Sequence, residues 1–173
     1  RMTLIGKNKR RISIGITGVV LAAAGAGIWF RSVPDRVFTV EIDADDESLV
    51  AIGRTIYGQQ CASCHGAKLE GQPDWRTRKP DGKLPAPPHD ETGHTWHHAD
   101  AQLFRLTRDG LKPPLAPDGY QSDMPAFGGV LTDEQIGAVL SFIKNSWSAP
   151  IRARQQRITD AVRKQSTLKG DEK

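Results

Sequence analysis

The sequence predicts an all-α fold, with several helices of a soluble domain after a membrane-spanning helix. Apolar residues recur at three- and four-residue steps in 46–60 and 132–147, the spacing of one helix face. Residues 132–135, Thr-Asp-Glu-Gln, form a capping box, which starts helices. Residues 12–30 are 19 residues without a charge, long enough to cross a bilayer as a helix.

The charges of the chain are unevenly distributed. Residues 1–11 carry five basic residues and no acid, and residues 152–173 carry seven basic and three acidic residues. The part between them, 12–151, holds 12 basic and 17 acidic residues, although the whole chain has a net charge of +4. The predicted folded part is therefore acidic. A nucleic-acid partner, which would need a basic surface on that part, is excluded.

The N-terminal part predicts a membrane anchor. Residues 1–11 are interpreted as a basic cytoplasmic N-terminus and residues 12–30 as a transmembrane anchor, because basic residues stay on the cytoplasmic side. The alternative is a cleaved signal peptide with small residues at 22–26. The apolar run continues through residues 28–30, which favours a retained anchor. Both interpretations export the rest of the chain, and we expect a single-pass protein of a bacterial inner membrane with its main domain on the periplasmic side.

After the anchor, the sequence predicts a linker at 31–45, a domain at 46–148 and a basic helix or tail at 149–173. Helices are expected at about 46–60, 99–108, 132–147 and 150–167. Asp45 or Asp46 is expected to cap the first of them. The stretch 66–98 contains five prolines and has weak periodicity, so it is predicted to be loop. A loop of this length is uncommon in a compact domain, and wrapping a large prosthetic group would explain it.

Both cysteines of the chain lie in the run Cys-Ala-Ser-Cys-His at 61–65. Two cysteines this close are typical of a thiol redox pair, of half a zinc site, or of a haem attachment site. A thioredoxin-like redox pair would follow a strand, whereas here a helical pattern comes first. In haem attachment, two thiols on one side of a helical turn bond to two vinyl groups, and the next residue reaches the iron. We therefore predict one covalent haem c held by Cys61 and Cys64, with His65 as an iron ligand.

The second iron ligand is predicted to be Met124. The other methionine, Met2, lies on the opposite side of the predicted membrane, and Pro125 stiffens the loop after Met124. A thioether is a soft donor that favours ferrous iron and raises the reduction potential. One alternative is that Met124 only fills the core. The other is a bis-histidine site, for which the candidates are His89, His94, His97 and His98.

Together these motifs resemble a class I cytochrome c. The resemblance rests on Tyr57, the run 61–66, the run Met-Pro-Ala-Phe at 124–127 and the run 131–136. It covers about residues 46–148 and implies the class I cytochrome c fold, in which helices pack around one covalently attached haem.

The resemblance also implies particular contacts. The first helix should cross the last helix of the domain near Phe142 and Trp147, with a close approach at Gly53. A proline carbonyl should accept the Nδ1 hydrogen of the iron-binding histidine, and Pro87 and Pro88 are both candidates. Trp96, between two histidines, is expected either to pack against a haem propionate or to fill core.

The predicted function follows from the predicted iron ligands. With both axial positions taken by protein, the iron has no open site, so we expect a single-electron carrier without catalytic residues. Expected partners are the lipid bilayer and respiratory or photosynthetic membrane complexes: a quinol–cytochrome c oxidoreductase, a terminal oxidase, or a supercomplex of both. The alternatives are a haem relay subunit of a periplasmic dehydrogenase and a haem sensor or peroxidase-like enzyme. The basic tail is expected to meet anionic lipid or an acidic partner, or to be a solvated helical face.

Overall fold

The computed structural model describes residues 39–171, with side chains through residue 168. This part belongs to one unit, residues 36–173. The predicted basic N-terminus and transmembrane anchor, residues 1–30, lie outside the described residues. Among the described residues, no helix combines the length and the apolar character needed to cross a bilayer.

The regular secondary structure of the described part is helical, as the sequence predicted. The elements are α1 (Glu47–Gln60), α2 (Ala62–His65), η1 (Thr95–His97), α3 (Asp100–Asp109), α4 (Asp133–Asn145) and α5 (Ala149–Asp171). The side chain of Asp46 caps α1 by accepting hydrogen bonds from the amides of Ser48 and Leu49, and the Thr132–Gln135 capping box starts α4. The short α2 and the 3-10 helix η1 were not predicted as separate elements.

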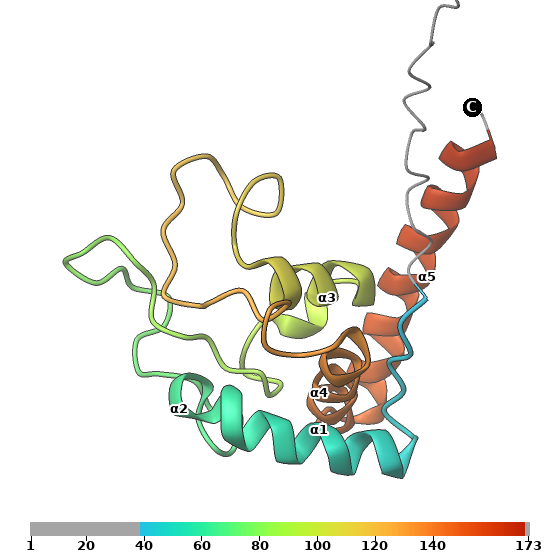
Figure 1. The fold of residues 1–173 in the computed structure, drawn as a ribbon, viewed down its shortest axis with the longest axis horizontal. Coiled ribbons are helices and arrows are strands. Elements are labelled where there is room, and N and C mark those ends of the chain that lie inside the picture. Colours follow the sequence, from blue (N-terminus) through green and yellow to red (C-terminus); the bar gives the residue numbers. More distant parts are fainter. Residues whose placement is uncertain (1–38, 172–173) are drawn as a thin grey trace, which may run out of the picture. The chain divides into compact units, whose positions relative to one another are not determined.

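Helices α1 and α4 cross closely and form the centre of the core (Figure 1). A Cβ atom on Gly53 would collide with the carbonyl of Ala138, so glycine is required for this approach. One turn later, the rings of Tyr57 and Phe142 lie 5.3 Å apart between centroids. The crossing implied by the family resemblance is therefore present. The core cluster comprises Ile56, Tyr57, Leu69, Leu103, Phe104, Ile136, Val139, Leu140, Ile143 and Trp147.

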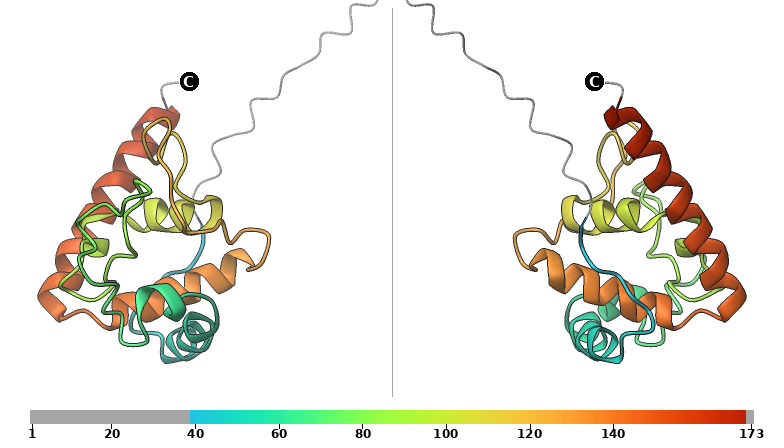
Figure 2. Two further views of the ribbon diagram at one scale, coloured as in Figure 1. Left: turned by 90° about the vertical axis from the view of Figure 1, so that its left-hand side faces the viewer. Right: turned by 90° about the vertical axis from the view of Figure 1, so that its right-hand side faces the viewer.

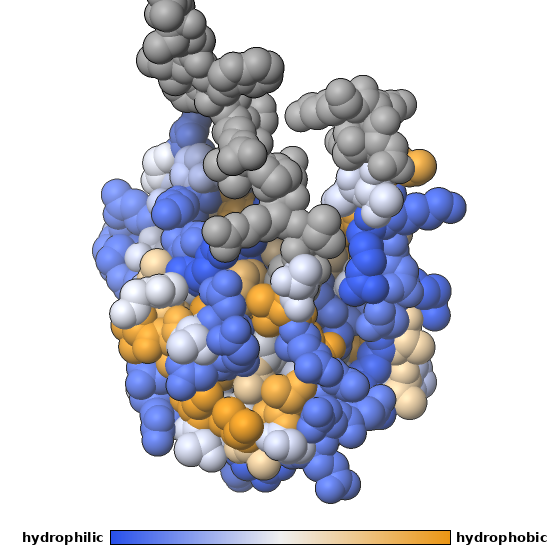
Figure 3. Space-filling view, turned by 45° about the vertical axis from the view of Figure 1, so that its right-hand side comes forward, coloured by the Kyte–Doolittle hydropathy of each residue, from blue (hydrophilic) through white to orange (hydrophobic). Residues whose placement is uncertain are grey.

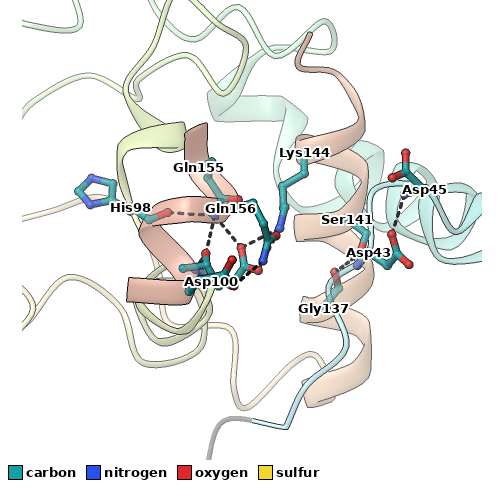
Figure 4. Close-up of polar contacts among 11 residues, drawn as sticks. Asp43, Asp45, His98, Asp100, Gly137, Ser141, Lys144, Gln155 and Gln156 are labelled. Carbon is teal, nitrogen blue, oxygen red and sulfur yellow. Dashed lines mark hydrogen bonds and ion pairs between the residues drawn. The ribbon is translucent and has the colours of Figure 1, made fainter. Parts of the chain in front are cut away.

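A buried cluster of polar side chains joins α3, α4 and α5 (Figure 4). The Nζ of Lys144 on α4 lies 2.9 Å from both carboxylate oxygens of Asp100, at the start of α3. From α5, Gln155 donates to Asp100 at 2.7 Å, and Thr159 accepts from the Asp100 amide at 3.0 Å. The first half of α5 is thus packed into the domain, although its sequence is strongly polar.

Residues 40–44 lie along α4. A Cβ on Gly137 would collide with the carbonyl of Glu41, which shows how closely the two segments lie. The amide of Asp43 donates to Ser141 Oγ at 3.0 Å, and Asn145 donates to the carbonyl of Ala44 at 2.9 Å. The described part of the predicted linker is therefore held on the helix surface.

In the view of Figure 1 the two long connections of the domain, 66–94 and 110–132, extend to the side away from α5. The left view of Figure 2 looks at that side, so the connections lie in front of the helices. On a different face, shown in Figure 3, hydrophilic residues predominate, with apolar areas between them. The position of the two connections matters because the first follows the Cys motif directly and the second contains Met124.

Candidate functional site

The Cys motif, residues 61–65, lies at a sharp turn between two helices. Cys61 ends α1, where its amide donates to the carbonyl of Tyr57, and it also begins the single turn α2. The amide of His65 returns to the carbonyl of Cys61 at 2.9 Å. Cys61 is half-buried and Cys64 is exposed, and neither forms a disulfide. Burial, and then the neighbouring Cys64, raises the pKa of the Cys61 thiol to about 11. The two thiols and His65 are thus grouped on one helical turn.

His65 is buried and is held by a backbone carbonyl. Its Nδ1 lies 2.8 Å from the carbonyl oxygen of Pro87. Because a carbonyl only accepts, Nδ1 carries the hydrogen and Nε2 is left as the nitrogen with a free lone pair. Burial lowers the pKa of His65, while the Pro87 contact opposes this shift. The structure therefore selects Pro87 over Pro88 and leaves a neutral imidazole, the form that binds metals.

The chain after His65 folds back so that Pro87 can reach it. The amide of Gly71 donates to the His65 carbonyl at 2.8 Å. Gly71 has a φ of +69°, a left-handed conformation that favours glycine, and a Cβ there would collide with the Pro87–Pro88 backbone. The amide of His89 then donates to the Leu69 carbonyl at 2.8 Å. A proline-rich loop is thereby given a defined path around His65.

Two aromatic residues of the core reach into this loop. The hydroxyl of Tyr57 on α1 donates to the carbonyl of Gly66 at 2.9 Å, and burial raises its pKa far above the usual range. The indole nitrogen of Trp147, just after α4, donates to the carbonyl of His89 at 2.8 Å. Both donors satisfy loop carbonyls that lie inside the domain, so the α1–α4 pair supports the loop as well as the core.

His89 was predicted to be a loop or surface group, or a rival iron ligand. His89 does lie in the loop, but its ring stacks face to face on the ring of His65, with centroids 4.0 Å apart and an interplanar angle of 23°. Two ligands on opposite sides of one metal point their nitrogens at each other and cannot stack in this way. His89 is therefore not placed as the ligand opposite His65. Burial, His65 and His94 together hold the pKa of His89 well below its usual range.

Two of the other histidines stack on tryptophans, and the ring of His98 meets the ring of His94 edge to face, with centroids 5.4 Å apart. The ring of His94 stacks on Trp75 at 5.3 Å, and the ring of His97 stacks on Trp96 at 3.7 Å. The indole nitrogen of Trp96 donates to the carbonyl of Glu91. Trp96 also packs against the core cluster, with the guanidinium of Arg154 over its ring. Because its donor is already used, Trp96 fits the core-filling interpretation better than a contact with a propionate.

Met124 lies in the second long connection and is partly buried. Its amide donates to Ser122 Oγ at 3.0 Å. The residue lines an open surface pocket of about 470 Å³ whose other lining residues include Lys83, Lys112 and Tyr120. None of the residues that line this pocket belongs to the Cys motif. Iron ligation by Met124 therefore stays a prediction.

Ion pairs connect the Met124 loop to the first long connection. The carboxylate of Asp123 lies 2.7 Å from the Nζ of Lys79, and its other oxygen pairs with Lys83. These two hydrogen bonds, the larger effect, and the two positive charges lower the pKa of Asp123. Sequence reasoning missed this contact because 44 and 40 residues separate the partners.

Comparison with known proteins gives consistent similarities. A family model described as cytochrome c matches residues 50–147. The chain is 31% identical over 65 residues to the cytochrome bc1 complex cytochrome c subunit of Corynebacterium diphtheriae, covering 38% of this chain and 23% of the relative. It is 22% identical over 144 residues to the Cbb3-type cytochrome c oxidase subunit FixP of Sinorhizobium medicae, covering 81% and 45%.

A third relative is cytochrome c-555 of Prosthecochloris aestuarii, 28% identical over 104 residues, which cover 56% of this chain and 86% of the relative. The chain spans about a quarter of the length of the bc1 relatives and less than half of the oxidase subunit. No solved structure matches.

The residues of the site fit a covalently attached haem. Two cysteines outside any disulfide and a neutral histidine share one turn, and the Pro87 carbonyl leaves the second nitrogen of that histidine for the iron. A carbonyl behind a metal-binding histidine is the usual support for such a ligand. Cys61, Cys64 and His65 are the residues that would hold the group.

Proposed function

This chain belongs to the cytochrome c family and carries covalently bound haem c, and from this premise we propose that it is a membrane-anchored carrier of single electrons between respiratory complexes. Members of the family act as electron carriers or redox subunits. The observation that carries the proposal is the fixed, neutral imidazole of His65, held at Nδ1 by Pro87. Haem supplies an iron that gains and loses one electron.

The proposal assigns the second axial position to Met124. The loop that bears it is stiffened by Pro125 and tied to the first long connection through Asp123. With His65 and Met124 both bound, no position is open for a small molecule. This arrangement favours electron transfer with little movement, and it argues against a sensor or a peroxidase-like enzyme.

The ligand assignment is tested by spectroscopy and by carbon monoxide. The ferric protein should show the long-wavelength charge-transfer band of methionine-bound iron, and the reduced protein should not bind carbon monoxide. A Met124→Ala variant should lose the band and gain carbon monoxide binding, whereas Met2→Ala, the matched control, should do neither. Carbon monoxide binding by the unchanged protein would overturn the proposal.

We also propose that residues 12–30 anchor the protein in a bacterial inner membrane, with the haem domain on the periplasmic side. The uncharged run and the basic residues before it support this. Residues 39–45 are held on α4, so residues 31–38 alone separate the anchor from the domain, and they reach at most about 28 Å. A tether this short raises the effective concentration of partners in the same membrane.

The partners proposed are a quinol–cytochrome c oxidoreductase and a terminal oxidase. The similarity to a bc1-complex subunit and to an oxidase subunit supports this choice. Isolation of the native protein from membranes in mild detergent is the test. Either complex should co-purify, and carbonate washing should not release the protein unless residues 1–35 are deleted. Recovery with a dehydrogenase instead would favour the relay-subunit alternative.

A further inference from the structure

The imidazole of His65 is contacted on two sides by different elements of the chain. The carbonyl of Pro87 meets its edge at Nδ1, and the ring of His89 covers one of its faces. These contacts restrict different movements. The hydrogen bond fixes the tautomer but tolerates a broad range of directions at the carbonyl oxygen. The stacked ring of His89 opposes rotation of the His65 ring out of its plane, because the two rings would clash.

The ring of His89 is itself fixed by hydrogen bonds, so it can restrict rotation of the His65 ring. Its Nδ1 lies 2.9 Å from Thr95 Oγ1, and the Thr95 hydroxyl donates to the carbonyl of Pro88 at 3.4 Å. Because that hydroxyl already donates its hydrogen, it accepts from His89, so Nδ1 of His89 is protonated. The ring is thus oriented through a buried threonine.

The backbone of His89 is held on both sides. Its amide donates to the Leu69 carbonyl, and its carbonyl accepts from the indole of Trp147, each at 2.8 Å. Trp147 is 2% exposed and belongs to the core cluster. Through these bonds the position of the His89 ring follows the position of the α1–α4 core.

We propose that His89 is a positioning residue that sets the plane of the His65 ring and thereby the orientation of the iron ligand. The inference rests on the proposed function in one respect, the role of His65 as an axial ligand. It does not depend on Met124. If His65 binds the iron, a ring held in one plane would allow electron transfer without rotation of this ligand.

The test uses the full-length ferric haem protein and its proton NMR spectrum. The spread of the haem-methyl resonances, that is, the range of their chemical shifts, reports the plane of the axial imidazole. His89→Leu keeps the approximate volume but has no flat ring, and it should change the spread. His89→Phe restores a flat face and should bring the spread back toward that of the unchanged protein. His97→Leu, which removes a histidine stacked on Trp96 and not on His65, should leave the spread unchanged.

Equal changes in His89→Leu and His89→Phe, or no change in either, would overturn the inference. If His89→Leu fails to retain haem, Thr95→Val tests the same idea, because it keeps both histidines but removes the Nδ1 partner that orients the His89 ring. The spread should then move, and an unchanged spread would count against the positioning role. Carbon monoxide binding and the methionine band are measured separately. A failure of Met124 ligation is therefore distinguishable from a failure of the His89 inference.

Discussion

Two groups of lysine–aspartate ion pairs lie in opposite surroundings in this molecule. The Lys144–Asp100 pair joins α4 to α3, and its side chains are only 5% and 6% exposed. The pairs that Asp123 makes with Lys79 and Lys83 join two loops, and the Asp123 side chain is 51% exposed. A buried pair is costly to break because one charge is left in the interior, whereas an exposed pair contributes little and weakens with salt.

This difference divides the site into two halves. His65 depends on the helical frame, because Trp147 and Tyr57 bind the loop that surrounds it. The Met124 loop depends on exposed charges around Asp123. We therefore expect the contacts around His65 to be lost only when the domain unfolds. The Met124 loop should come away from the first long connection under milder conditions.

Breaking the buried pair should have the largest effect. Lys144→Met leaves the Asp100 carboxylate without its cation in the interior and should lower the free energy of unfolding by about 3–5 kcal/mol. The measurement is denaturant unfolding of the ferric haem protein. In the double variant Lys144→Met/Asp100→Asn no buried charge is left, so most of the loss should be recovered. An equal loss in the double variant would contradict an electrostatic origin.

Closing the α1–α4 crossing should have the next largest effect. In Gly53→Ala the new methyl group meets the Ala138 carbonyl, and overpacking of this kind costs about 1–3 kcal/mol. Gly58→Ala is the matched control in the same helix, because nothing lies within 4 Å of its added Cβ. The control should stabilise the protein by about 0.5–1 kcal/mol. Similar effects of both substitutions would show that the close approach does not limit stability.

The same division explains how much could be predicted from the sequence. Helix boundaries depend on neighbours in the chain, so the Thr132 capping box was found from the residues alone. The cap of α1 was narrowed to Asp45 or Asp46, and the structure uses Asp46. The grouping of the thiols with His65 was likewise local, since all lie within 61–65.

Contacts between distant segments were not accessible to that reasoning. The choice of Pro87 over Pro88 depends on the path of a whole loop, and the stack of His89 on His65 joins rings 24 positions apart. The buried Lys144 left one signal, because it lies four residues after Leu140 on the apolar face of α4. Its partner Asp100, 44 residues away, left none.

Weakening the exposed pairs should have the smallest effect, and it should be confined to the Met124 side. Asp123→Asn removes the charge that both Lys79 and Lys83 contact. If Met124 binds the iron, added imidazole should replace it more readily in this variant, by about two- to fivefold in affinity, as expected for exposed ion pairs. Imidazole titration of the ferric protein, followed at the methionine band, measures this.

Salt sharpens the same test. In the unchanged protein, imidazole affinity should rise with ionic strength, because screening weakens the pairs. In Asp123→Asn the salt dependence should largely disappear. Asp81→Asn is the matched control, because the ion pair of Asp81 with Lys79, at 3.9 Å, lies within the first long connection. This variant should keep the salt dependence. A salt response that survives in Asp123→Asn would mean that the Met124 loop is held by its own packing, and the contrast between the two halves of the site would then be wrong.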